Sequence, residues 1–95
     1  LDPADDAAAL EYARANASSI YHSAGTCRMG GGSAAAGDVV DGALRVNGVD
    51  ALRVADASIM PTIVAGNTNA ATLLIAETAA ALVLQGKEEG GVLST

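Results

Sequence analysis

The stretch N-T-N-A-A-T-L-L-I-A-E-T-A-A-A-L-V-L-Q, residues 67–85, decides the fold that we expect for this chain. An asparagine at 67 or 69 supplies an N-cap, no glycine or proline interrupts the run, and Gly86 follows as a natural stop, so the pattern predicts a helix to about Gln85. The helix is apolar on almost every side, which indicates burial between layers of something larger. Its length and its central Glu77 make it a poor membrane span, so we expect no membrane crossing.

Short extended segments are expected upstream of this helix. The dipeptide Asn47-Gly48 is a strong turn signal between extended runs, and it predicts two short strands joined by a turn. The apolar positions of these strands are Leu44, Val46, Val49, Leu52 and Val54. Pro61 biases Met60 away from the helical region and so extends the irregular segment that follows. Together with the helix, these segments place the chain in the α/β class, as an α+β fragment.

A first helix is expected near the start of the chain. Its signals are a cap, a proline in the first turn and negative charge at the positive end of the helix, supplied by Asp2, Pro3, Asp5 and Asp6. We expect this helix to reach about Asn16, followed by an extended stretch from Ser18 to His22. Residues 30–37, G-G-G-S-A-A-A-G, favour an exposed loop to which we assign no chemistry.

The composition indicates a thin core. The chain has 95 residues, of which 51% are hydrophobic, but it contains no Trp or Phe. Most of the hydrophobic residues are Ala and Val, and alanine buries little area. We therefore expect a segment of a larger protein, or a piece that needs another chain to complete its core. The net charge of −6, with only five scattered cations, excludes nucleic acid as an expected partner.

The single cysteine, Cys27, cannot form an internal disulfide, which is compatible with a reducing compartment and favours the cytoplasm over secretion. No signal peptide is visible, and the chain does not begin with Met, so we expect its true N-terminus to lie upstream. One histidine, one cysteine and dispersed carboxylates offer no ligand spacing, so we expect no metal site.

The only histidine, His22, is the best candidate for proton transfer. It lies three residues before Gly25, in the tract Y-H-S-A-G-T-C-R-M-G, residues 21–30. Imidazole has an unperturbed pKa near neutrality, so a positioned histidine can take and return a proton. An ordinary structural histidine is the alternative. The polar residues near the second helix can likewise have a structural role instead of a functional one. Asn67 or Asn69 can serve as an N-cap, and Asp56 can form a turn.

Three tracts in order carry a family resemblance: residues 21–30, residues 38–61, D-V-V-D-G-A-L-R-V-N-G-V-D-A-L-R-V-A-D-A-S-I-M-P, and residues 66–72, G-N-T-N-A-A-T. Over roughly residues 18–86 the chain resembles the C-terminal part of the glucose/methanol/choline (GMC) oxidoreductases, which are FAD-dependent flavoproteins. The G-N-T-N form is more similar to the choline oxidase and alcohol dehydrogenase branch than to glucose oxidase.

The resemblance implies a division of the chain between two domains. Residues 1–17 would form a leading helix, and residues 18–54 a substrate-domain segment that contributes strands, the catalytic histidine and the Gly-rich loop. Residues 55–86 would return to the FAD-binding domain and end in its buried final helix, and residues 87–95 would form a flexible tail. No G-x-G-x-x-G turn occurs in the chain, so FAD would be bound mainly by an N-terminal portion of the enzyme, on the same or a separate chain.

The resemblance also implies roles for individual residues. His22 matches the family's catalytic histidine and would accept the proton of an alcohol substrate, while Asn67 matches the second member of the catalytic pair. The family's flavin contacts from this region fall on the Asp-Ala-Ser turn and on the opening of the last helix. Here these positions are Asp56, Ala57, Asn67, Thr68 and Asn69.

The expected function is the oxidation of an alcohol CH–OH group to a carbonyl by hydride transfer to flavin. One alternative within the same scaffold is a relative that keeps the flavin but cleaves a cyanohydrin, like a hydroxynitrile lyase. Another alternative is a non-catalytic accessory fragment that packs against a partner chain.

Overall fold

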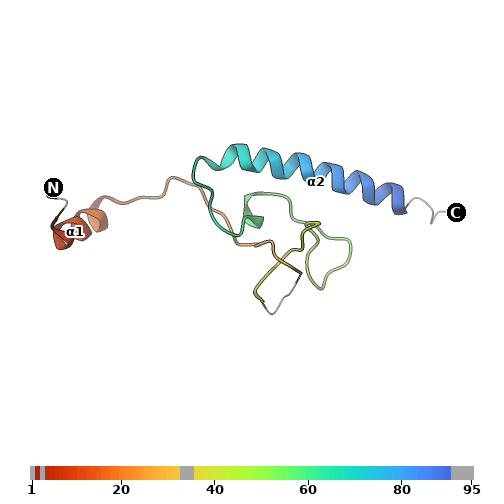
Figure 1. The fold of residues 1–95 in the computed structure, drawn as a ribbon, viewed down its shortest axis with the longest axis horizontal. Helices are drawn as coiled ribbons and strands as arrows, with labels where there is room; N and C mark the ends of the chain where they lie inside the picture. Colours follow the sequence, from red (N-terminus) through yellow and green to blue (C-terminus); the bar gives the residue numbers. More distant parts are fainter. Residues whose placement is uncertain (1, 3, 33–35, 91–95) are drawn as a thin grey trace.

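The structure is a computed structural model that describes residue 2, residues 4–32 and residues 36–90, with side chains as far as residue 86. Its helical elements are α1 (Asp6–Asn16), the 3-10 helix η2 (Ala57–Ile59) and α2 (Thr68–Gly90). Figure 1 shows α1 at one end of the molecule and a body of loops beneath α2. The molecule measures 71 × 29 × 17 Å. Its radius of gyration is 19.3 Å, against about 12 Å for a compact domain of this length, so the chain is elongated.

Helix α1 begins at Asp6 because Asp5 caps it. The Asp5 carboxylate accepts a hydrogen bond from the Ala8 N–H at 3.0 Å. The predicted cap, Asp2, is wrong, because its carboxylate instead accepts the Ala4 N–H at 2.9 Å, one turn too early. The helix ends at Asn16, as predicted. None of its residues is buried, and among the described elements neither η2 nor α2 packs against it.

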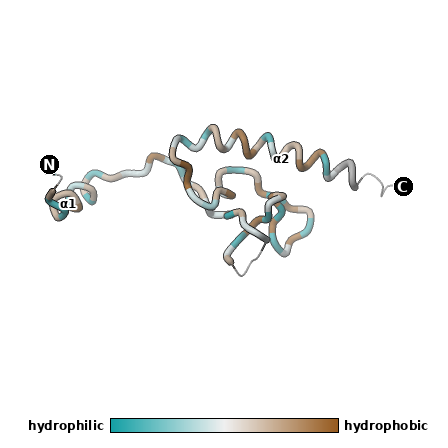
Figure 2. The backbone as a smooth tube through the Cα atoms, viewed as in Figure 1, coloured by the Kyte–Doolittle hydropathy of each residue, from teal (hydrophilic) through white to brown (hydrophobic). Residues whose placement is uncertain are grey.

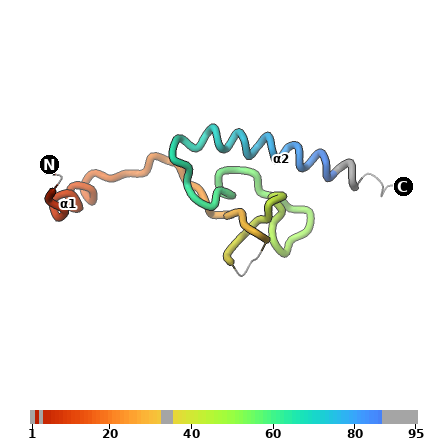
Figure 3. The backbone as a smooth tube through the Cα atoms, viewed as in Figure 1, coloured from red at the N-terminus to blue at the C-terminus, as the bar shows by residue number. Residues whose placement is uncertain are grey.

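The loop body is joined by backbone hydrogen bonds rather than by continuous strands. Met29 and Val40 form an isolated parallel bridge, and two antiparallel bridges pair Val40 with Val46 and Arg45 with Arg53. Figure 3, coloured along the sequence, shows the chain passing from α1 into this body and returning to the start of α2.

The prediction of two strands joined by a hairpin is wrong for the described residues, which contain bridges but no strand. The Asn47-Gly48 turn forms, with a hydrogen bond from the Val49 N–H to the Val46 carbonyl at 3.3 Å and φ of +77° at Gly48. The chain pairs again at Leu52, whose carbonyl accepts the Val46 N–H at 3.0 Å, and at Arg53, so the connection is a wide loop. A two-stranded ribbon without a neighbouring strand is marginal in water, which explains why pairing stops after single bridges.

A small core lies between the loop body and α2. Its buried residues are Val40, Leu44, Ile59, Met60 and Ala79. Val40 is fully buried, and Ile75 and Leu82 of α2 pack against the cluster. Figure 2 shows brown, hydrophobic residues recurring along the coloured part of α2, and Leu73, Leu74, Val83 and Leu84 of this helix are exposed. The helix was expected to be buried on almost every side, but the described residues cover only one of its faces.

Helix α2 continues past its predicted end. Gly86 was expected to stop it, but the helix runs on to Gly90, and residues 87–90 of the expected flexible tail are helical. A glycine inside a helix costs only about 1 kcal/mol relative to alanine, which the flanking turns can offset. Residues 91–95 of that tail, Pro3 and residues 33–35 of the Gly-rich loop lie outside the described residues.

By length and composition alone, the segment Thr68–Gly86 of α2 is long and apolar enough to cross a membrane. The core helix of a soluble protein meets the same criterion, and the presence of one such helix is weak evidence. The absence of a membrane span stays a prediction.

Candidate functional site

The tract around His22 is shaped by two residues with left-handed backbone. Tyr21 has φ of +63°, which is uncommon for a residue with a side chain, and Gly25 has φ of +88°. A Cβ at position 25 would make a tight contact, 3.3 Å, with the Met60 carbonyl oxygen, and the positive φ also favours glycine at this position. The H-x-x-G-T spacing thus places His22 between two sharp changes of chain direction.

Backbone hydrogen bonds join this tract to the segment around η2. The Cys27 N–H donates to the Ser58 carbonyl at 2.9 Å, and the Met29 N–H donates to the Ile59 carbonyl at 2.8 Å. We call this pair of bonds the main-chain joint. It brings residues about 30 positions apart in sequence to neighbouring places, at the cost of closing the loop between them.

A hollow of about 310 Å³ opens beside the main-chain joint. Three segments line it: the tract after His22, the turn before η2 and the second turn of α2. The lining residues are Ser23, Ala24, Thr26, Asp56, Ala57, Ser58 and Thr72. The hollow therefore combines hydroxyl groups with one carboxylate, and it lies where the three family tracts meet.

The structure brings together some of the predicted site residues. Asp56 and Ala57 line the hollow. His22 is half-buried and directly precedes the lining residue Ser23, while Asn67 is exposed at the position before α2. Within the described part of the chain, the side chains of His22 and Asn67 form no hydrogen bond with each other or with another group. Their pairing stays a prediction.

The remaining predicted residues open α2. Thr68 is half-buried, and its carbonyl accepts the Thr72 hydroxyl at 2.8 Å, whereas Asn69 is exposed. Reasoning from the sequence missed five residues of the lining: Ala24 and four with hydroxyl side chains, Ser23, Thr26, Ser58 and Thr72. The signal that could have located them is their position inside or beside the three tracts.

Asp56 caps η2. Its carboxylate accepts the Ser58 N–H at 2.9 Å and also accepts the Ser58 hydroxyl. The Ser58 hydroxyl, followed by its N–H, holds the pKa of Asp56 below its ordinary value, against a small opposing effect of burial. The turn-former interpretation of Asp56 is thus correct locally, and the same cap places the carboxylate at the hollow.

Stability should depend on the charge of Asp56. Because its pKa is lowered in the folded chain, the cap stabilises the fold fully above the unfolded pKa of about 3.9, and this contribution is lost as the pH falls through the lower folded value. Asp56→Ala should cost about 1 kcal/mol at neutral pH. Urea unfolding measured in the intact enzyme at neutral and acidic pH checks this. Asp56→Asn, which keeps an oxygen acceptor but does not titrate, should be less sensitive to acid; equal acid sensitivity would contradict the assignment.

The N-terminus of α2 provides unpaired backbone donors near the hollow. The first N–H groups of a helix have no intrahelical acceptor, and the helix dipole adds positive potential there. The first turn of α2 contains no acidic residue that would neutralise this potential. The start of α2 is therefore suited to a neighbouring group that carries negative charge.

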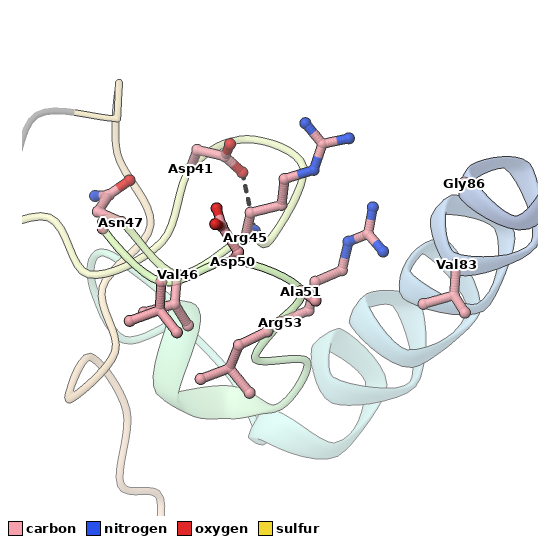
Figure 4. A pocket seen from close by; sticks show the side chains of 12 residues that line it. Asp41, Arg45, Val46, Asn47, Asp50, Ala51, Arg53, Val83 and Gly86 are labelled. Atoms are coloured by element: carbon pink, nitrogen blue, oxygen red, sulfur yellow. Dashed lines mark hydrogen bonds between the residues drawn. The ribbon is translucent and has the colours of Figure 1, made fainter. Parts of the chain in front are cut away.

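A larger hollow, of about 800 Å³, lies elsewhere, between the loop of residues 45–53 and the C-terminal part of α2. Figure 4 shows Arg45 and Arg53 on one side of it and Val83 and Gly86 on the other. No predicted site residue lines it. The Arg53 guanidinium lies 3.7 Å from the position of a Cβ on Gly86 and donates to the Ala43 carbonyl at 3.1 Å, so it lies between the loop and the helix.

Among the described residues, no group of three or more His, Cys, Asp or Glu side chains could hold a metal ion.

Comparison with known families shows which family the residues around the smaller hollow belong to. Residues 1–76 match the family model of the GMC oxidoreductases, in its C-terminal part. The chain belongs to the GMC oxidoreductase family. The resemblance inferred from the three tracts is confirmed, and the match also includes residues 1–17, which carry no diagnostic motif.

Curated GMC relatives match over most of this chain. The alcohol dehydrogenase [acceptor] of Pseudomonas putida is 54% identical over 72 residues, which cover 76% of this chain and 12% of that protein. The oxygen-dependent choline dehydrogenase 1 of Chromohalobacter salexigens is 54% identical over 72 residues, with 76% and 13% covered. An uncharacterized GMC-type oxidoreductase of Mycobacterium tuberculosis is 56% identical over 79 residues, with 82% and 14% covered.

This GMC segment therefore spans about one eighth of the length of the curated relatives that it matches. The family is FAD-dependent. Relatives named as alcohol and choline dehydrogenases agree with the branch indicated by the G-N-T-N motif.

Proposed function

We propose that this chain is the C-terminal catalytic segment of an FAD-dependent enzyme that oxidises the CH–OH group of an alcohol to a carbonyl. The observation that carries the proposal is the hollow at the main-chain joint, where the His22 tract, the Asp56 turn and α2 come together. The relatives' names, alcohol dehydrogenase and choline dehydrogenase, support the substrate class. The segment acts together with the remaining portion of the enzyme, which would bind most of the FAD.

The described residues fit part of a flavin site. The start of α2 offers uncompensated N–H groups, and the hollow is lined by Ser23, Thr26 and Ser58, whose hydroxyls can donate or accept hydrogen bonds. Such donors suit the negative charge that a reduced flavin gathers near its pyrimidine edge. Asp56, Ala57, Thr68 and Asn69 are the residues of this chain that would contact the cofactor.

His22 would act as the proton acceptor. FAD, when bound, supplies the acceptor for the hydride of the alcohol carbon. Hydride loss becomes easy only as the hydroxyl proton leaves, so a base must lie within hydrogen-bond reach of the substrate oxygen. An imidazole nitrogen of His22 would take this proton. The half-buried position of His22 between Tyr21 and Gly25 restricts its freedom, which favours a fixed orientation toward the substrate.

Asn67 would orient the same oxygen. Its amide can donate and accept hydrogen bonds but does not exchange protons at working pH. It lies at the N-cap position of α2 and has no side-chain partner among the described residues, so its amide remains available to a substrate.

Anaerobic mixing of the intact enzyme with a primary alcohol tests the proposal. We expect the absorbance of oxidised flavin to bleach, because the hydride of the substrate is transferred to the cofactor. Bleaching by short alcohols or by choline, with release of the aldehyde, would support the proposal. Cleavage of a cyanohydrin without bleaching would contradict it and favour a lyase, and an intact enzyme that holds no flavin would favour the accessory fragment.

A further inference from the structure

Helix α2 has two apolar faces, of which only one is covered in this chain. The inner face packs on the loop body, and its residues recur three or four positions apart: Ala71, Thr72, Ile75, Ala79, Leu82 and Gly86. On the opposite face Leu73 is 59% exposed and Leu84 is 62% exposed, and Leu74 beside them is 68% exposed. We call Ala70, Leu73, Glu77, Ala80 and Leu84 the outer stripe, since a spacing of three and four residues places them on one side of a helix.

Glu77 is the single charged residue of the outer stripe. It follows Leu73 by four residues and precedes Leu84 by seven, so leucine lies on both sides of it along the helix. Glu77 is exposed, and the ion pair found among the described residues joins Arg28 and Asp38, not Glu77. A cover over Leu73 and Leu84 would also enclose the Glu77 carboxylate.

The accessible surface of the chain indicates what kind of partner buries the outer stripe. The accessible surface is 7105 Å², against about 5,000 Å² for a compact monomer of this mass. This excess is shared by α1, the loops and α2, and for one chain it corresponds to the large interfaces of permanent complexes. The chain also spans only 11–14% of its curated relatives, so most of a GMC enzyme is available to cover it.

We infer that the outer stripe of α2 docks against the remaining portion of the same enzyme, and that this portion places an Arg or Lys side chain opposite Glu77. A carboxylate enclosed among leucines is costly unless a cation and hydrogen bonds compensate it. The stripe thus specifies a partner surface that is apolar along its length and positive at its centre. The inference depends on the family membership and goes beyond the proposed reaction.

Substitution of Glu77 by leucine in the intact enzyme tests the charge requirement. If a cation faces Glu77, Glu77→Leu leaves that cation enclosed and unpaired, and the Tm should fall by about 5 °C or more despite the added apolar area. Glu77→Gln should lower the Tm less, and Glu77→Lys should also release FAD. The matched control is Gln85→Leu, on the flank of the same helix, which should change the Tm by no more than about 2 °C.

Each other result would overturn the inference. An unchanged Tm for Glu77→Leu means that Glu77 stays in water, and a raised Tm means that it faces an apolar surface. Dissociation of a dimer with FAD retained would identify a second copy of this chain as the cover. Recovery of the wild-type enzyme in membranes, lost in Glu77→Lys, would identify lipid. These readouts are the Tm, FAD content and assembly state, so they are independent of whether an alcohol is oxidised.

Discussion

Replacing His22 with alanine in the intact enzyme should lower kcat/KM for the alcohol by about 10²- to 10⁴-fold, the range that a positioned general base contributes. The chain has no second histidine that could replace it, and the polar groups lining the hollow are hydroxyls and the Asp56 carboxylate, which are weaker bases than imidazole. The measurement is steady-state turnover normalised to bound FAD, together with the rate of flavin reduction in a single anaerobic turnover.

His22→Gln is the matched control for size and polarity. Glutamine can still hydrogen-bond the substrate oxygen but cannot accept its proton, so its kcat should remain low while substrate binding is better preserved than in His22→Ala. Wild-type turnover in His22→Ala, or full turnover in His22→Gln, would refute the assignment.

Replacing Gly30 with alanine should destabilise the loop body by about 1–3 kcal/mol. A Cβ at position 30 would lie 1.9 Å from Cγ of Asp38, so the Asp38 side chain would have to leave. That carboxylate pairs with Arg28 at 3.4 Å and accepts the Gly31 N–H at 3.1 Å, and both interactions would be lost. The free energy of unfolding from urea denaturation of the intact enzyme measures the effect.

The neighbouring glycine provides the control. Nothing lies within 4 Å of a Cβ on Gly31, and its φ is not positive, so Gly31→Ala should be close to neutral. In the background of Asp38→Ala the Gly30→Ala change should also lose most of its cost, because the clashing group is gone. Equal destabilisation by the two alanine variants, or no coupling to Asp38, would contradict the steric explanation.

The helices of this chain could be predicted because their signals are local. The end of α1 at Asn16 and the start of α2 after Asn67 are each determined within a few residues, whereas the N-cap of α1 was predicted too early, at Asp2 instead of Asp5. The strands could not be predicted correctly, because strand pairing depends on neighbouring strands, which the described residues do not supply. Val46 pairs with Val40, and Arg53 pairs with Arg45, each through a single bridge. The stop at Gly86 failed because glycine permits a helix end without enforcing one.

The candidate site was predicted in part for the same reason. The family resemblance implied roles for Asp56 and Ala57, which the structure places at the hollow. Thr72 was missed because its place there depends on the approach of α2 to the η2 turn, a contact between elements that periodicity does not reveal. The pairing of His22 with Asn67 stays a prediction, because it would depend on tertiary contacts that local signals do not encode.

The main-chain joint has a consequence for how such enzymes diversify. Peptide groups of Cys27, Met29, Ser58 and Ile59 make its hydrogen bonds, and every amino acid except proline carries the same donor and acceptor. We therefore expect that Ala24 and Thr26 can be exchanged for other residues without disturbing the attachment between the His22 tract and the Asp56 turn. Libraries randomised at these two positions should yield altered substrate preference more often than unfolded protein, which makes the joint a fixed frame for directed evolution.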